Sequence, residues 1–243
     1  MRLAVLSDIH ANLHALQAVL ADVDRVGADA LVCLGDLVGY GAYPNEVVDY
    51  VRLRGIQTVM GNYDVGVGFD LDDCGCVYRD PEEDRRGRQS LWWTRQSTVP
   101  DHKEYLRQLP MHIREEVDGL RLLFVHGSPR RINEYLYADR PEATFEHIAQ
   151  VAGCDVLFFG HTHLPYQKWV GRTLFVNTGS VGKPRDGDPR AGYVIVEFNH
   201  RPKVEFRRVT YDVAAASRAL REAGLPPHFA DLLENGGRAL VRV

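Results

Sequence analysis

The chain has 243 residues, 45% of them hydrophobic, and a formal net charge of -4. This length supports a sizeable core in one large domain or two small ones, and the negative charge argues against a strongly basic nucleic-acid-binding surface. No run approaches the ~20 apolar residues of a membrane span, and the first run, Leu3–Leu6, is too short for a signal segment. We therefore expect a soluble, cytoplasmic protein with no membrane partner.

The first quarter of the chain alternates between short apolar runs and amphipathic stretches. The runs predict strands, and the stretches, with apolar residues at helical spacing or a proline in the first turn, predict helices. In chain order, we expect a strand at 3–6, a helix at 11–26, a strand at 31–34, a helix at 44–51 and a strand at 58–60. This β-α-β-α-β order predicts parallel strands with right-handed crossovers.

The rest of the chain is less regular. Residues 65–88 are rich in Gly, Asp and Arg with little periodicity, which favours a long loop or cap inserted in the domain. Beyond it the patterns predict helices near 89–96, 102–109 and 141–152 and strands at 120–125 and 155–159. Three runs at 174–176, 193–198 and 203–209 suggest a meander in a second sheet, and 211–243 reads as a helical tail. We expect residues 1–243 to form a single α/β domain.

The four cysteines do not form a disulfide framework. Cys33 and Cys154 lie inside apolar runs, where a buried free thiol is the usual state. Cys74 and Cys76 form a C-x-C pair, but the second pair that a structural zinc site needs is missing. We expect both to be solvent-facing loop thiols, with redox or metal chemistry as the lower-ranked alternative.

Polar side chains of metal-ligand type follow five of the apolar runs. In open α/β sheets, functional groups gather where strands end. Taken singly, each residue reads as a turn residue, a helix cap or a hydrogen-bonded structural histidine, but their repetition at five strand ends favours a metal site. The seven candidate ligands are Asp8, His10, Asp36, Asn62, His126, His161 and His163.

The chemistry of these seven side chains indicates the kind of metal. Four imidazoles, two carboxylates and one amide oxygen suit manganese, iron, zinc, cobalt or nickel better than magnesium or calcium, which favour all-oxygen shells. Seven ligands are more than one tetrahedral site uses. Two ions bridged by a carboxylate would use them all.

The order of these blocks resembles the calcineurin-like metallophosphoesterases, and the flanking segments 39–46, 126–129 and 177–186 resemble its small bacterial branch. The resemblance spans about residues 1–200 and implies two mixed β-sheets packed as a sandwich flanked by helices, in α-β-β-α layers. It also implies two divalent ions, of which we favour manganese. One ion would be held by Asp8, His10, Asp36 and His163, and the other by Asp36, Asn62, His126 and His161.

The resemblance further implies in-line attack on phosphorus by a metal-bridging hydroxide. Asp36 as the bridging ligand, Tyr63 and Asp64 are the candidate catalytic residues. Many members have histidine where this chain has Tyr63. A phenol with a pKa of about 10 is a weaker proton donor at neutral pH than an imidazolium, so we expect slow turnover of esters with poor leaving groups.

Four further residues are candidates for contacting the substrate or orienting the site: Asn12, Arg130, Lys183 and Arg185. The charged ones could equally be solvated loop residues. We expect hydrolysis of a small phosphodiester or nucleotide-type phosphate ester, in a chain that is compatible with a homo-oligomer. The alternatives are hydrolysis of dinucleoside polyphosphates or phosphoproteins and, ranked lowest, a non-catalytic metal-binding scaffold.

Overall fold

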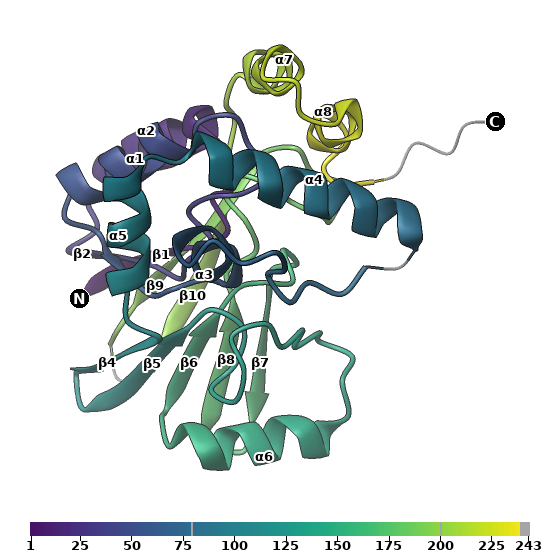
Figure 1. Cartoon of the computed structure of the whole chain (residues 1–243). Coiled ribbons are helices and arrows are strands. Elements are labelled where there is room, and N and C mark those ends of the chain that lie inside the picture. The colour runs from purple at the N-terminus through teal and green to yellow at the C-terminus, as the bar shows by residue number, and fades with distance from the viewer. Residues whose placement is uncertain (79, 200, 239–243) are drawn as a thin grey trace.

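The computed structural model describes residues 1–78, 80–199 and 201–238, which contain two five-stranded sheets (Figure 1). The first sheet has the order β10 (Lys203–Val209), β9 (Ala191–Glu197), β1 (Arg2–Leu6), β2 (Ala30–Cys33) and β3 (Gln57–Thr58). The second has the order β4 (His112–Val117), β5 (Leu120–Val125), β6 (Val156–Phe159), β8 (Thr173–Asn177) and β7 (Tyr166–Val170). The helices are α1 (Leu13–Val26), α2 (Pro44–Leu53), α3 (Asn62–Gly68), α4 (Pro81–Ser97), α5 (Pro100–Gln108), α6 (Glu142–Ala152), α7 (Val213–Glu222) and α8 (Pro227–Glu234).

Both sheets are mixed, as expected. In the first, β1, β2 and β3 run parallel, with Leu6 opposite Cys33 and Cys33 opposite Thr58. Strand β9 is antiparallel to β1, and β10 is antiparallel to β9. In the second, β5, β6 and β8 run parallel between the antiparallel edge strands β4 and β7. The parallel strands of each sheet therefore end at one edge.

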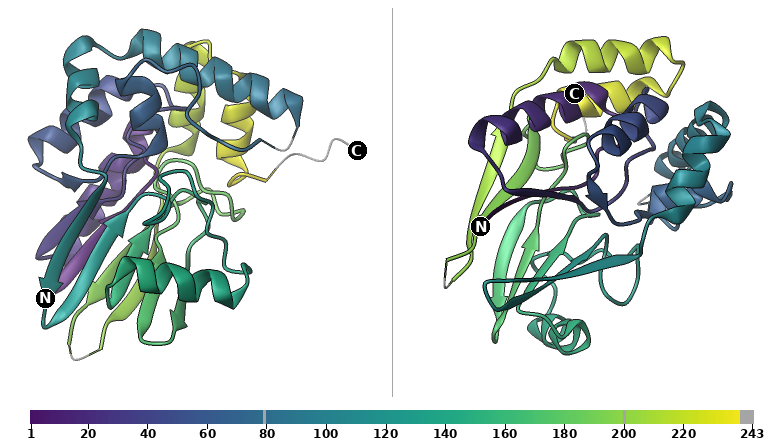
Figure 2. Two further views of the ribbon diagram at one scale, coloured as in Figure 1. Left: turned by 60° about the horizontal axis from the view of Figure 1, so that its bottom comes forward. Right: turned by 90° about the vertical axis from the view of Figure 1, so that its left-hand side faces the viewer.

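The two sheets pack face to face, and helices cover their outer faces (Figure 2). Alternate residues of β1 point to opposite sides: Leu3 and Val5 enter the core between the sheets, whereas Leu6 packs beneath the helices. In the core between the sheets, Phe124 and Phe158 stack with ring centroids 5.0 Å apart. Because both faces of these strands are buried, they read in sequence as continuous apolar runs. Helix α6 covers the outer face of the second sheet. The α-β-β-α layering is confirmed.

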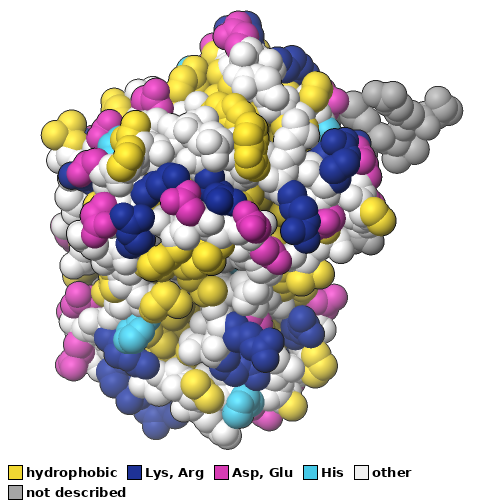
Figure 3. All heavy atoms as spheres, in the orientation of Figure 1, with side chains coloured by type: hydrophobic (Ala, Val, Ile, Leu, Met, Phe, Trp, Pro, Cys, Tyr) yellow, Lys and Arg dark blue, Asp and Glu magenta, His cyan; other side chains and the backbone are white. Residues whose placement is uncertain are grey.

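The loop or cap expected over 65–88 is shorter than predicted, because helices occupy both ends of that range. Helix α3 continues to Gly68 and helix α4 begins at Pro81, capped by the Asp80 side chain, which accepts hydrogen bonds from the amides of Glu82 and Glu83. The predicted helix near 89–96 is the second half of α4, and its first half was missed because it buries little apolar surface. Its exposed face instead alternates basic and acidic side chains (Figure 3), with ion pairs one turn apart such as Arg88 to Asp84 at 2.9 Å.

The predicted meander is wrong. Only β8 of its three runs lies in the second sheet, whereas β9 and β10 return to the first sheet beside β1. Edge strands β4 and β7 were not predicted, because one face of each is solvated and their sequences carry polar residues.

The helical tail is confirmed through α7 and α8, while residues 239–243 lie outside the described residues. Both helices pack against each other, and α7 contacts α1 (Figure 2). In the part of the chain that the structure describes, no helix is both long and apolar enough to cross a membrane.

Candidate metal centre

The structure brings together all seven side chains that the sequence singled out. Two follow β1, one follows β2, one begins α3 just after β3, one follows β5 and two follow β6. The ends of the parallel strands of both sheets meet here, so residues from five distant segments share one buried site. The seven are Asp8, His10, Asp36, Asn62, His126, His161 and His163.

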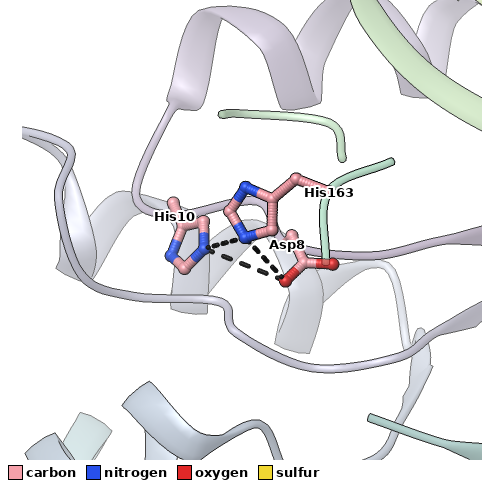
Figure 4. A group of neighbouring side chains, drawn as sticks. All are labelled: Asp8, His10 and His163. Carbon is pink, nitrogen blue, oxygen red and sulfur yellow. Dashed lines mark hydrogen bonds and ion pairs between the residues drawn. The ribbon is translucent and has the colours of Figure 1, made fainter. Parts of the chain in front are cut away.

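Six of these residues form two groups of three, and within each group the ligand atoms all lie within 4.8 Å of one another. Asp8, His10 and His163 form the first group, in which the three side chains point toward one common centre (Figure 4). The Nε2 atom of His163 lies 3.2 Å from both His10 Nε2 and Asp8 Oδ1. Asp36, His126 and His161 form the second group.

Asp36 lies between the two groups. Its Oδ2 atom is 3.3 Å from His126 Nε2 in the second group and 3.6 Å from His10 Nε2 in the first. Asn62 belongs to the second group, because its Oδ1 atom is 3.0 Å from His126 Nε2. The Asp36 carboxylate thus lies near histidines of both groups.

Hydrogen bonds orient three of the imidazoles toward the centre. The Nδ1 atoms of His10, His126 and His163 face the backbone carbonyls of Val38, Leu34 and Lys183, respectively. A carbonyl can only accept, so each Nδ1 carries a hydrogen, and His10 and His163, when neutral, present their Nε2 lone pairs inward. Two such lone pairs facing each other at 3.2 Å need a cation between them.

Two further atoms are suited to binding a cation. Among the described residues, Asp8 Oδ1 and His161 Nε2 are buried and have no hydrogen-bond donor or acceptor partner. A buried carboxylate oxygen without a donor is costly unless a charge compensates it. Together with the mixed nitrogen and oxygen donor set, these atoms fit divalent transition-metal ions.

The electrostatics keep most of the imidazoles in the ligating form. Burial lowers the pKa of His10 and of His161 to about 3, and lowers that of His163 well below its ordinary value. His126 differs: burial alone would lower its pKa, but the adjacent Asp36 carboxylate outweighs burial and raises it to about 10. Metal binding at the second group would therefore displace a proton from His126.

The backbone around the centre is unusual. Five of the seven residues have a left-handed conformation, which non-glycine residues seldom adopt and which often marks functional sites: Asp8, His10, Asp36, His161 and His163, with φ between 49° and 64°. The loops also approach one another closely. A Cβ atom on Gly160 would lie 2.0 Å from Ser7 Oγ, and one on Gly61 would lie 2.1 Å from the Asp36 amide nitrogen.

Asp64 lies beneath the loop that carries Asp36. One of its carboxylate oxygens accepts hydrogen bonds from the amides of Asp36 and Gly61, at 2.8 and 2.9 Å, and the other accepts from Leu37 at 2.9 Å. Burial, together with the charge of Asp36, raises the pKa of Asp64 to about 7. These contacts hold the loop in place.

Tyr63 is buried beside the first group. Its backbone amide donates to Asp36 Oδ1 at 2.8 Å, and its ring meets the His10 ring edge-on with centroids 5.5 Å apart. Its hydroxyl lies 3.4 Å from that of Tyr78. Burial raises the pKa of Tyr63 well above its ordinary value, which makes it a still weaker proton donor at neutral pH.

The four candidate substrate contacts lie in different environments. Asn12 caps α1 and donates to the Gly182 carbonyl at 3.0 Å, so its amide group is already engaged. Arg130 is paired with Glu134. Lys183 and Arg185, in contrast, line a pocket that also contains His10.

The expectation of solvent-facing thiols at Cys74 and Cys76 is wrong. Cys74 is buried and Cys76 is half-buried, because their loop folds under the centre. The amide nitrogen of Asn62 donates to the Cys74 carbonyl at 3.0 Å and lies 3.3 Å from Cys76 Sγ, so the loop turns the Asn62 oxygen toward His126. Cys33 and Cys154 are buried free thiols, as expected.

Sequence reasoning also missed Tyr135, whose ring centroid lies 4.0 Å from that of His161. Tyr135 lies in an irregular segment that ends no strand, so nothing in the local pattern marks it.

Comparison with known proteins agrees with this geometry. Residues 1–201 match the family model described as Calcineurin-like phosphoesterase superfamily domain. Uncharacterized protein MJ0912 of Methanocaldococcus jannaschii is 35% identical over 92% of this chain and 93% of its own length. Phosphodiesterase YfcE of Escherichia coli is 26% identical over 78% of this chain and 84% of its own length. The crystal structure of a metallophosphoesterase from Sphaerobacter thermophilus shares 34% identity and covers 97% of this chain and 100% of its own, with a TM-score of 0.78.

The fold, the ligand groups and these relatives define a metal-dependent hydrolase of phosphate esters. The chain belongs to the calcineurin-like phosphoesterase superfamily.

Proposed function

We propose that the chain is a dinuclear phosphoesterase that hydrolyses small phosphodiesters or nucleotide-type phosphate esters. The observation that carries the proposal is the pair of ligand groups sharing Asp36, whose carboxylate lies within 3.6 Å of a histidine in each group. Two bound divalent ions, for which we favour manganese, would acidify a water molecule as the nucleophile and offset the charge of the phosphoryl oxygens.

Neighbouring residues of the chain position the candidate metal ligands. Asp36 would hold both ions, and Asp64 positions it through the backbone amides of Asp36 and Leu37. The carbonyls behind the imidazoles fix their tautomers, so that neutral nitrogen atoms face the ions.

Tyr63 limits the esters that we expect the site to hydrolyse efficiently. It occupies the position next to Asn62, and its buried phenol keeps its proton at neutral pH. The leaving group consequently receives little help from a general acid at this position. We infer that phosphodiesters and activated phosphates are turned over faster than esters with poor leaving groups.

The test is hydrolysis of bis(4-nitrophenyl) phosphate and of 4-nitrophenyl phosphate, titrated with Mn²⁺, Zn²⁺, Fe²⁺, Co²⁺ and Ni²⁺, with metal analysis of the purified protein. We expect metal-dependent activity with about two ions per chain, greater on the diester, and its loss in Asp36→Asn. Asp139→Asn is the matched control, because Asp139 is exposed and lies outside the site. Inactivity with every metal would instead favour a non-catalytic scaffold, and an active protein holding one ion would refute the dinuclear assignment.

A further inference from the structure

A pocket adjoins the first ligand group and encloses about 580 Å³ of empty space, part of it open to solvent. One side is polar and includes the ligand His10 with the cations Lys183 and Arg185. The lining also has an apolar part that includes Leu220, Phe229 and Leu232. Since His10 belongs to the pocket wall, a molecule bound there lies next to the candidate metal centre.

The apolar side comes from the C-terminal helices. Leu220 lies on α7, and Phe229 and Leu232 lie on α8, all beyond residue 201, where the match to the family domain ends. This side is therefore an addition to the shared catalytic domain.

The two helices are firmly attached. Phe229 meets the ring of Tyr40 edge-on at 5.1 Å, and Arg221 of α7 pairs with Asp231 of α8 at 2.9 Å. The wall is thus formed before any ligand arrives.

The two cations lack anionic partners. Within the described ranges, neither Lys183 nor Arg185 has a carboxylate within salt-bridge distance, whereas Arg130 and Arg208 are paired with Glu134 and Asp186. Lys183 instead has its ammonium 4.0 Å from the centroid of the Tyr40 ring. Two unpaired cations side by side, next to a metal ligand, favour an anionic group such as phosphate.

We propose that this pocket binds the organic part of the substrate, and that this part is an apolar alkyl or aryl group. Lys183 and Arg185 bind the phosphate oxygens, while Leu220, Phe229 and Leu232 cover the hydrocarbon. The hydrocarbon side chains of α7 and α8 offer no hydrogen bonds to the edge of a nucleobase, and the Asn12 amide in the same pocket is already engaged. The proposal rests on the phosphoesterase function and narrows its substrate to phosphate esters of apolar alcohols or phenols.

The test uses alkylphosphonates, which mimic a phosphate ester but cannot be hydrolysed at the P–C bond. Binding of methyl-, butyl- and hexylphosphonate to the full chain supplied with Mn²⁺ is measured by calorimetry. Burying a methylene group improves binding by up to about fourfold, so we expect affinity to rise at least about tenfold from the methyl to the butyl compound. Equal affinity for all three would overturn the proposal.

Substitutions separate the two sides of the pocket. Leu232→Gln should flatten the dependence on chain length and leave methylphosphonate binding unchanged, because Leu232 is half-buried and glutamine is a good helix former. Leu53→Gln is the matched control, since Leu53 is 85% exposed on α2. Lys183→Met should weaken all three ligands by a similar factor of roughly ten. An unchanged dependence on chain length in Leu232→Gln would refute the apolar subsite.

Two further outcomes separate this proposal from the phosphoesterase function. Tighter binding of adenosine 5′-monophosphate than of hexylphosphonate would show that the pocket selects a nucleoside, which overturns the apolar assignment. If no nitrophenyl ester is hydrolysed with any metal but the dependence on chain length persists, only the enzymatic function fails, and the subsite stands.

Discussion

The close packing of the loops at the centre makes Gly160→Ala the sharpest test of the site. Gly160 precedes His161, and a Cβ there would lie 2.0 Å from Ser7 Oγ and 2.5 Å from Asp8 Oδ2. These distances are far below van der Waals contact, and Ser7 and Asp8 are fully buried. The two loops must therefore move apart, and with them Asp8 of the first ligand group and His161 of the second.

The expected magnitude follows from this overlap. Overpacking a buried site costs typically 1–3 kcal/mol, and an overlap this severe belongs near about 3 kcal/mol. For a chain of this size, each kcal/mol lowers the melting temperature by about 2–4 °C, so we expect a fall of about 6–12 °C. Thermal unfolding in a chelator measures this cost without bound metal, and Mn²⁺ calorimetry measures the loss of affinity when the ligand groups are displaced.

A second substitution shows whether the overlap is the cause. Ser7→Ala removes the atom closest to the added Cβ, together with a hydrogen bond to Asp8. The double variant should therefore lose less stability than the sum of the two single variants. If Gly160→Ala unfolds and binds Mn²⁺ like the wild type, or if the two losses simply add, the loops are not packed as described.

Three other predictions concern Tyr63, the ion pair between Asp22 and Arg207, and metal binding. Tyr63→His should raise turnover of alkyl phosphate esters at least about tenfold relative to nitrophenyl esters, and an unchanged ratio would count against a role in leaving-group protonation. Burial acts to raise the pKa of Asp22, but hydrogen bonds, chiefly from Arg207, lower it to about 2. The stabilisation by these hydrogen bonds is therefore present above about pH 4 and is lost as the pH falls toward 2. After allowance for solvent screening, we expect it to contribute about 1 kcal/mol to the free energy of unfolding. Urea unfolding at different pH values measures this contribution, which should be absent in Asp22→Asn. Mn²⁺ at a hundred times its Kd should raise the melting temperature by about 5–10 °C, and an equal rise in Asp36→Asn would show that the ion binds elsewhere.

The centre was predictable from sequence because its ligands obey a local rule. Asp8, Asp36 and His126 each follow a continuous apolar run, and such runs are strands buried on both faces. Once the strands are parallel, their ends must meet, so residues far apart in sequence converge without any knowledge of tertiary contacts. The two mixed sheets packed as a sandwich were implied instead by the resemblance to the family.

The sequence predictions were wrong where the local pattern does not determine the tertiary structure. Strand β9 is as apolar as β8, and nothing local shows that it returns to pair with β1, with Leu3 opposite Val196. The first half of helix α4 is stabilised by surface ion pairs and a cap, so it shows no apolar periodicity. Cys76 looks exposed in a Gly- and Asp-rich segment, and only the folded loop shows that it lies against the Asn62 amide.

The same distinction explains why the sequence predicts the reaction type better than it predicts the substrate. Metal ligands must present particular donor atoms at strand ends. Only a few residue types have such atoms, so the pattern can be recognised in the sequence. The apolar wall of the pocket needs only hydrocarbon at Leu220, Phe229 and Leu232, a requirement that any amphipathic helix satisfies. Those helices carry no motif, and their role follows only from their position beside His10 and the unpaired cations Lys183 and Arg185. If this pocket selects the substrate as proposed, the preference depends on tertiary packing, and it should change with the tail while the metal chemistry stays the same.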